Sequence, residues 1–131
     1  MSQPTTYLQH HIALINELIS VAEKLLAMNT LREPQQEALY EQLQQLAKAD
    51  ADEDFYVLGQ SILVKIVAAW PQLTPNISRD LFWFFGGDCL QYMPDEEIAN
   101  YQALDEARHV ADSADQPFDI ATEKAKIFGL H

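Results

Sequence analysis

The sequence predicts an all-α protein, a compact single-domain bundle of five to six helices around one central apolar helix. Apolar residues recur every three or four positions along most of the chain, which is the spacing of helices that bury one face. Several of these segments begin beside a proline, an acidic residue or a hydroxyl residue, as helix starts commonly do. A chain of 131 residues can bury a core without disulfides or a structural metal. We therefore expect residues 1–131 to form one helical domain.

The net charge of the chain limits the classes of molecule that it can bind. Its 20 acidic and 8 basic residues give a formal net charge of -12, while 48% of the residues are hydrophobic. That hydrophobic content is sufficient for a folded core. A surface this negative repels phosphate groups, so we expect neither nucleic acid nor membrane as a partner. A protein partner or self-association fits the charge better, and no cofactor is expected.

The sequence also predicts a cytoplasmic location. Its single cysteine, Cys89, cannot form an internal disulfide, which suits a reducing compartment. The N-terminal residues show no secretion signal. The most apolar run, residues 62–70, is interrupted by Lys65 and is too short to cross a bilayer.

The first two helices are expected over residues 4–28 and from Pro34 onward. Ser2 is predicted to cap the first helix, with Pro4 in its first turn. The second helix opens at Arg32-Glu33-Pro34 and has a narrow apolar stripe. Its stripe consists of Leu39, Leu43 and Leu46, and its glutamines are expected to face water: Gln35, Gln36, Gln42, Gln44 and Gln45.

The third helix, Phe55 to Trp70, is predicted to be the central one because it is apolar on nearly all sides. Its β-branched residues also suit a strand, but sixteen residues exceed an ordinary strand length. Gly59 would let a neighbouring helix approach closely. The acidic residues 49–54 before it lack the ligand pattern of a calcium loop, so we expect them to cap the helix.

The fourth helix is expected to begin at Thr74-Pro75 and to continue to about Tyr92. Gly86 and Gly87 interrupt it, and two glycines inside a helix cost roughly 2 kcal/mol relative to alanine. We expect close packing against another helix to offset this cost. The fifth helix is predicted from Asp95 to Ala111, and the last one after Pro117, ending at Gly129. The predicted inward residues of the fifth helix are Ile98, Tyr101, Leu104, Ala107 and Val110.

The segment from Asn76 to Met93 is the least ordinary part of the chain. Phe82, Trp83, Phe84 and Phe85 are consecutive, and consecutive residues on a helix point in different directions, so they cannot all face one core. Trp83 is predicted to point toward a second surface. That surface is either covered by the C-terminal segment or open to a partner, since exposed aromatic patches tend to mark interaction sites.

Two functional hypotheses follow from this segment. The first is a non-enzymatic interaction or regulatory module, in one version a homodimer, that uses the aromatic and Gly-Gly face of residues 81–93. The second is a small-molecule-binding protein or an enzyme with a pocket around Asp88 and Cys89. Asp88 would be the polar group of this pocket, and in one version Cys89 would be a nucleophile, although a free cysteine on an aromatic face is usually buried and inert. The candidate residues shared by both hypotheses are Phe82, Trp83, Phe85, Gly86, Gly87, Asp88, Cys89 and Tyr92.

Metal binding is a weaker third hypothesis. Glu106 and His109 form a single E-x-x-H pair on one helix face, with Asp105 four residues before the histidine. A metal site needs further ligands, which the sequence does not supply nearby. We therefore expect these residues to form surface charge interactions instead.

Overall fold

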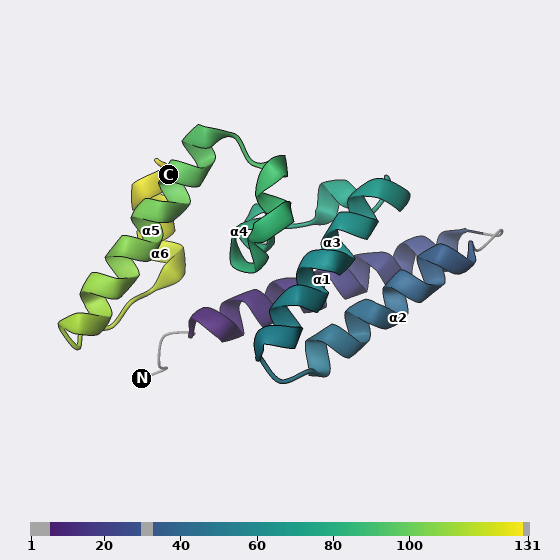
Figure 1. Ribbon diagram of the computed structural model, residues 1–131, viewed down its shortest axis with the longest axis horizontal. Helices are drawn as coiled ribbons and strands as arrows, with labels where there is room; N and C mark the ends of the chain where they lie inside the picture. Colours follow the sequence, from purple (N-terminus) through teal and green to yellow (C-terminus); the bar gives the residue numbers. More distant parts are fainter. Residues whose placement is uncertain (1–5, 30–32, 130–131) are drawn as a thin grey trace. The chain divides into compact units, whose positions relative to one another are not determined.

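The computed structural model describes residues 6–29 and 33–129, and in these residues it contains helices and no strand (Figure 1). The all-α prediction is therefore confirmed. Contacts within the chain divide it into two units, His11–Tyr92 and Met1–His10 with Met93–His131. Within the described residues, no helix is long and apolar enough to cross a membrane. The elements are α1 (Tyr7–Met28), α2 (Pro34–Lys48), α3 (Glu53–Ala69), the 3₁₀ helix η1 (Thr74–Asn76), α4 (Arg79–Phe85), the 3₁₀ helix η2 (Gly87–Tyr92), α5 (Asp95–Ser113) and α6 (Ile120–Phe128).

Helix α1 begins later than the sequence suggested. Thr6 and Gln9 form a capping box, in which the Gln9 N–H donates to Thr6 Oγ1 at 3.1 Å and the Thr6 N–H donates to Gln9 Oε1 at 3.0 Å. This reciprocal pair satisfies free N–H groups of the first turn and sets the start at Tyr7. The predicted cap Ser2 and the predicted entry residue Pro4 lie outside the described residues.

Helices α2 and α3 run side by side in the unit His11–Tyr92 (Figure 1). Helix α2 starts at Pro34 as predicted, although Arg32 lies outside the described residues. The predicted leucine stripe of α2 is buried, but one prediction for this helix is wrong. Gln36 does not face water and is only 7% exposed, because it lies in the first turn next to Trp70.

Helix α3 is capped by Asp52, whose carboxylate accepts the Phe55 N–H at 3.0 Å. The acidic connection therefore caps the helix as predicted. The central position of α3 is also confirmed, since α2, α4 and η2 all pack against it. However, α3 is not buried on all sides, because Val57 is 67% exposed and Leu58 is exposed as well.

The predicted long fourth helix is wrong. Thr74–Asn76 forms only a 3₁₀ turn, and α4 starts separately at Arg79, where the hydroxyl of Ser78 accepts the Asp80 N–H at 3.2 Å. Helix α4 ends at Phe85 because Gly86 adopts φ 65° and ψ -148°, a conformation incompatible with a continuing helix. The chain then turns into η2, so the glycines end the helix and are not packed inside it.

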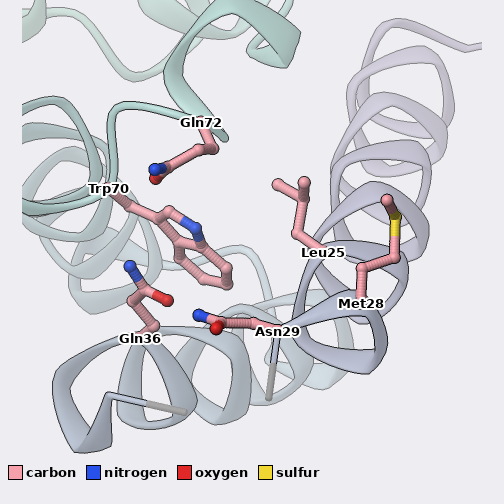
Figure 2. A pocket seen from close by; sticks show the side chains of 6 residues that line it. All are labelled: Leu25, Met28, Asn29, Gln36, Trp70 and Gln72. Atoms are coloured by element: carbon pink, nitrogen blue, oxygen red, sulfur yellow. The ribbon is translucent and has the colours of Figure 1, made fainter. Parts of the chain in front are cut away.

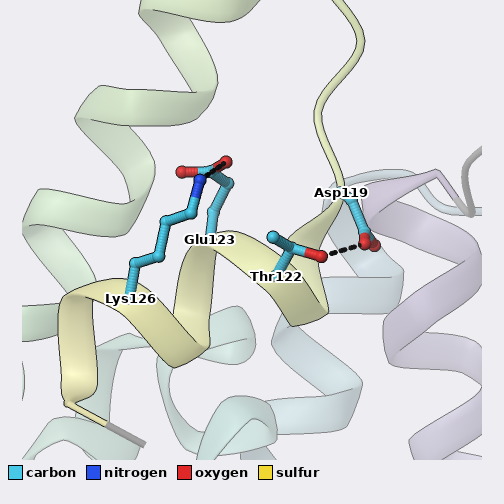
Figure 3. Close-up of polar contacts among 4 residues, drawn as sticks. All are labelled: Asp119, Thr122, Glu123 and Lys126. Carbon is cyan, nitrogen blue, oxygen red and sulfur yellow. Dashed lines mark hydrogen bonds and ion pairs between the residues drawn. The ribbon is translucent and has the colours of Figure 1, made fainter. Parts of the chain in front are cut away.

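The described part of the second unit centres on α5 and α6. Tyr101 and Leu104 of α5 are buried as predicted, and the Tyr101 ring packs edge-on against Phe128 of α6 at 4.8 Å. Val110 was expected to point inward but is 69% exposed, because only the first half of the α5 stripe is covered. Helix α6 begins at Ile120 and not directly after Pro117, and its first turn carries a hydrogen bond from Thr122 to Asp119 (Figure 3). Gly129 ends α6 in the left-handed conformation, as predicted.

Candidate interaction site

The aromatic residues of α4 form the centre of a ring cluster in the unit His11–Tyr92. Phe84 and Phe85 pack edge-on at 4.9 Å, and Phe55 of α3 lies 6.1 Å and 5.6 Å from their respective centroids. On one side of this cluster, the imidazole of His11 stacks on Phe84 at 4.2 Å with nearly parallel rings. Tyr56 lies 5.2 Å from Phe84 and is 37% exposed. Three of the four consecutive aromatics, Phe82, Phe84 and Phe85, are therefore core residues, and the last two link α1, α3 and α4.

Close packing of α3 against α4 depends on Gly59. A Cβ atom at this position would lie 2.0 Å from Cε1 of Phe85. Any larger residue would have to displace the ring, which the neighbouring rings hold in place. The prediction that Gly59 permits a close helix approach is therefore confirmed.

Gly86 and Gly87 form the turn between α4 and η2. Both have positive φ angles, 65° and 54°. A Cβ atom on Gly87 would also lie 2.1 Å from Nε2 of Gln60, so η2 lies directly against α3. The predicted close packing is thus present at Gly87, while the backbone conformation is what makes glycine necessary at Gly86.

Cys89 lies beneath this turn and is fully buried. Its Sγ lies 3.8 Å from the carbonyl oxygen of Gln60, to which the thiol donates a weak hydrogen bond. Burial, and secondly the nearby carboxylate of Asp88, raise the pKa of the Cys89 thiol to about 11. Nucleophilic cysteines need the opposite environment, accessible and electropositive.

The candidate residues thus divide into an inner and an outer set. The inner residues Phe82, Phe85 and Cys89 are buried, and the last two contact α3 at Gly59 and Gln60. The outer residues are half-buried or exposed, and Asp88 is exposed while its neighbour Cys89 is buried. The outer set consists of Trp83, Gly86, Gly87, Asp88 and Tyr92.

Phe82 and Tyr92 also line a hollow of about 220 Å³, together with residues of α3 and η1. Arg79 holds this part of the segment together. Its guanidinium donates to the carbonyl oxygen of Tyr92 at 2.8 Å and lies 5.3 Å from the centroid of the Phe82 ring. This contact ties the end of η2 to the start of α4.

Sequence analysis missed the exposed apolar residues at the start of α3. Val57 and Leu58 belong to the apolar helix that was expected to be central, yet both are exposed, as is Tyr56 beside them. Gln60, one helical turn further, contacts η2 at Gly87, so these residues continue into the outer set. We name this region the α3–η2 surface; it comprises Tyr56, Val57, Gln60, Gly87 and Asp88. The signal was in the sequence, because a helix that is apolar on every side needs neighbours on every side.

In the described residues, the fold brings no third metal ligand to Glu106 and His109. Glu106 and His109 are both exposed on α5, and Asp105 forms an ion pair with Arg108 at 3.7 Å. Among the described residues, no group of three or more histidine, cysteine or acidic side chains is placed to hold a metal ion. In the same unit the Arg108 guanidinium also lies 4.0 Å from the centroid of the Tyr7 ring.

Comparison with known families places the whole chain in one of them. Residues 3–130 match the family model described as PA2817-like, so the protein belongs to the PA2817-like family. Comparison with curated proteins and with solved structures gave no match. The family description states no activity.

Proposed function

We propose that the protein is a non-enzymatic interaction module that self-associates as a homodimer in the cytoplasm. The observation that carries this proposal is the exposure of Val57, 67% of whose surface is open on a helix that is otherwise the centre of its unit. Around it the α3–η2 surface joins exposed apolar residues of α3 to the outer side of the 81–93 segment. Exposed apolar patches with a polar rim are typical of protein interfaces.

The charge distribution favours a second copy as the occupant of the α3–η2 surface. The net charge of -12 makes two copies repel each other across most of their surface. Asp88 is the one charged residue among the five of the α3–η2 surface, and the exposed Glu53 and Asp54 lie at its rim, one helical turn before Val57. A basic partner would instead be drawn to the acidic parts of the chain. A two-fold symmetric pair needs only one such patch, used by both copies.

The test compares the oligomeric state of two matched variants. Sedimentation velocity over a range of protein concentrations measures it. Val57→Glu places a charge in the α3–η2 surface, whereas Val110→Glu makes the same change at an equally exposed valine of α5, 69% exposed. We expect the unmodified protein and Val110→Glu to dimerise, and Val57→Glu to dissociate at least roughly tenfold more readily.

A protein that stays monomeric at all concentrations would overturn the proposal. The same holds if the two glutamate variants weaken the dimer equally, because the interface would then not be the α3–η2 surface. Circular dichroism of both variants checks that the fold is retained.

The geometry gives less support to an enzyme that uses Cys89. Its thiol is buried and its pKa is raised to about 11, so little thiolate forms near neutral pH. Asp88, the polar group proposed for the same pocket, is exposed and does not share the buried environment of the thiol.

A further inference from the structure

A second feature of the unit His11–Tyr92 lies at the other end of α3. A hollow of about 270 Å³ opens where α1 ends, α2 begins and α3 ends (Figure 2). In the part of the chain that the structure describes, its lining combines three side-chain amides, one indole and two apolar side chains, with no charged group among them. These residues are Leu25, Met28, Asn29, Gln36, Trp70 and Gln72.

Gln36 is the most informative residue in this hollow. It is 7% exposed, yet no hydrogen bond to its carboxamide is found among residues 6–29 and 33–129. Its backbone N–H bonds to the Glu33 carbonyl at 3.0 Å, which fixes the residue in the first turn of α2. The carboxamide points toward the indole of Trp70 (Figure 2). The carboxamide has no bonding partner in these residues and is not among the fully enclosed unpartnered atoms, so it still reaches the water of the hollow. A ligand in the hollow can replace this water and bond to the carboxamide.

Trp70 supplies a second polar group at the same place. Its side chain is 1% exposed, and no acceptor for the indole N–H is found in the described part of the chain. The nitrogen edge of the ring faces the hollow (Figure 2). The backbone holds this edge rigidly, because the Trp70 N–H donates to Ile66 at 2.8 Å and its carbonyl accepts from Leu73 and Thr74. A fixed donor of this kind needs no ordering when a ligand binds.

We propose that this hollow binds a small neutral ligand that carries a carboxamide or lactam group beside an apolar flank. The carbonyl of such a group accepts from the Trp70 indole N–H, and its N–H donates to the carboxamide oxygen of Gln36. Gln72 adds a further amide at the rim, and Leu25 and Met28 provide the apolar wall. The site lies at the C-terminal end of α3, apart from the α3–η2 surface at its start, so it does not rest on dimer formation.

Charge, size and burial exclude other classes of ligand. A charged ligand would lose its hydration without meeting an opposite charge in the lining, and an anion would also meet the negative field of the chain. The volume of about 270 Å³ lies just below the range of roughly 300–1,000 Å³ for drug-sized ligands, so the ligand is small. A sugar normally stacks on an open aromatic face, whereas Trp70 is 1% exposed and offers no open face.

The experiment follows the indole N–H resonances of the full ¹⁵N-labelled chain during titration with defined probes. The chain has two tryptophans, and a Trp83→Phe variant identifies the signal of Trp70. The probes are uracil and 2-pyrrolidone as neutral lactams, orotate as the anionic analogue of uracil, and glucose as a neutral compound without an amide. We expect the lactams to shift the Trp70 indole signal saturably, and orotate and glucose to leave it unchanged.

Two glutamines of α2 provide the matched variants. Gln36→Leu removes the buried carboxamide and keeps the size of the side chain, whereas Gln45→Leu makes the same change at an exposed position. We expect the first to weaken lactam binding at least roughly tenfold and the second to leave it within about twofold. A Gln72→Leu variant gives an intermediate loss, and it guards against a folding defect at Gln36.

The proposal is overturned if neither lactam shifts the Trp70 signal at millimolar concentration, or if orotate and glucose shift it equally. It is also overturned if Gln36→Leu and Gln45→Leu bind alike. None of these readouts depends on the oligomeric state, so the outcome is separate from that of the dimer experiment.

Discussion

At the scale of single residues, Cys89 shows how burial controls chemistry in this fold. The thiol lies beneath the η2 turn, where its pKa is raised from 9.0 to about 11 by burial and by Asp88. We expect a disulfide reagent at pH 8 to leave Cys89 unmodified in the folded protein and to label it rapidly in denaturant. Fast labelling of the folded protein would show that the turn opens readily.

The same shift sets the pH dependence of stability. In the unfolded chain the thiol loses its proton near pH 9, whereas in the folded chain it does so only near pH 11. The folded state is therefore fully stabilised by the neutral thiol below pH 9 and loses this contribution as the pH rises to about 11. Chemical denaturation of the protein and of Cys89→Ala should show their difference in unfolding free energy changing in this window, by at most about 1.4 kcal/mol per pH unit.

Individual residues were also where sequence reasoning succeeded and failed most clearly. Gly59 and Gly87 were expected in close contacts, and both are, because glycine has no Cβ atom and lets a neighbouring residue approach the backbone. Gln36 was assigned to water because glutamine is usually exposed. Its burial next to Trp70 depends on how α2 meets the end of α3, and no local pattern records that contact.

At the scale of elements, helix existence could be predicted and helix ends only in part. Pro34, Asp95 and Gly129 mark ends that agree with the structure, because proline, acidic residues and glycine act locally. The long fourth helix was wrong because its apolar spacing continues past Phe85. Spacing alone does not reveal that Gly86 turns the backbone into a region that other residues avoid.

The N-cap of α3 provides a test at this scale. Asp52 accepts the Phe55 N–H at 3.0 Å, while Asp50, two residues earlier in the same acidic connection, is exposed and precedes the helix. Asp52→Ala should lower the unfolding free energy by about 1 kcal/mol, and Asp50→Ala should change it much less. Urea denaturation of both variants measures this difference. Equal losses would mean that the charge of the connection matters and the cap does not.

At the scale of the whole molecule, composition was sufficient for the fold class and insufficient for the site. The hydrophobic content and the helical spacing predicted an all-α chain, which the structure confirms. The Trp70 hollow draws on α1, α2 and the end of α3, and these residues lie up to 47 positions apart, from Leu25 to Gln72. Such a site is a property of packing between elements, which one sequence does not display.

The overall charge leads to a prediction about association. Two copies that each carry a net charge of -12 repel each other, and salt screens this repulsion over a Debye length of roughly 10 Å at 0.1 M. The α3–η2 surface is largely uncharged, so screening weakens no attraction there. Raising sodium chloride from low to moderate concentration should therefore tighten the dimer, as measured by sedimentation at fixed protein concentration. Dissociation at higher salt would instead indicate an interface held by opposite charges, in which Val57 plays no central part.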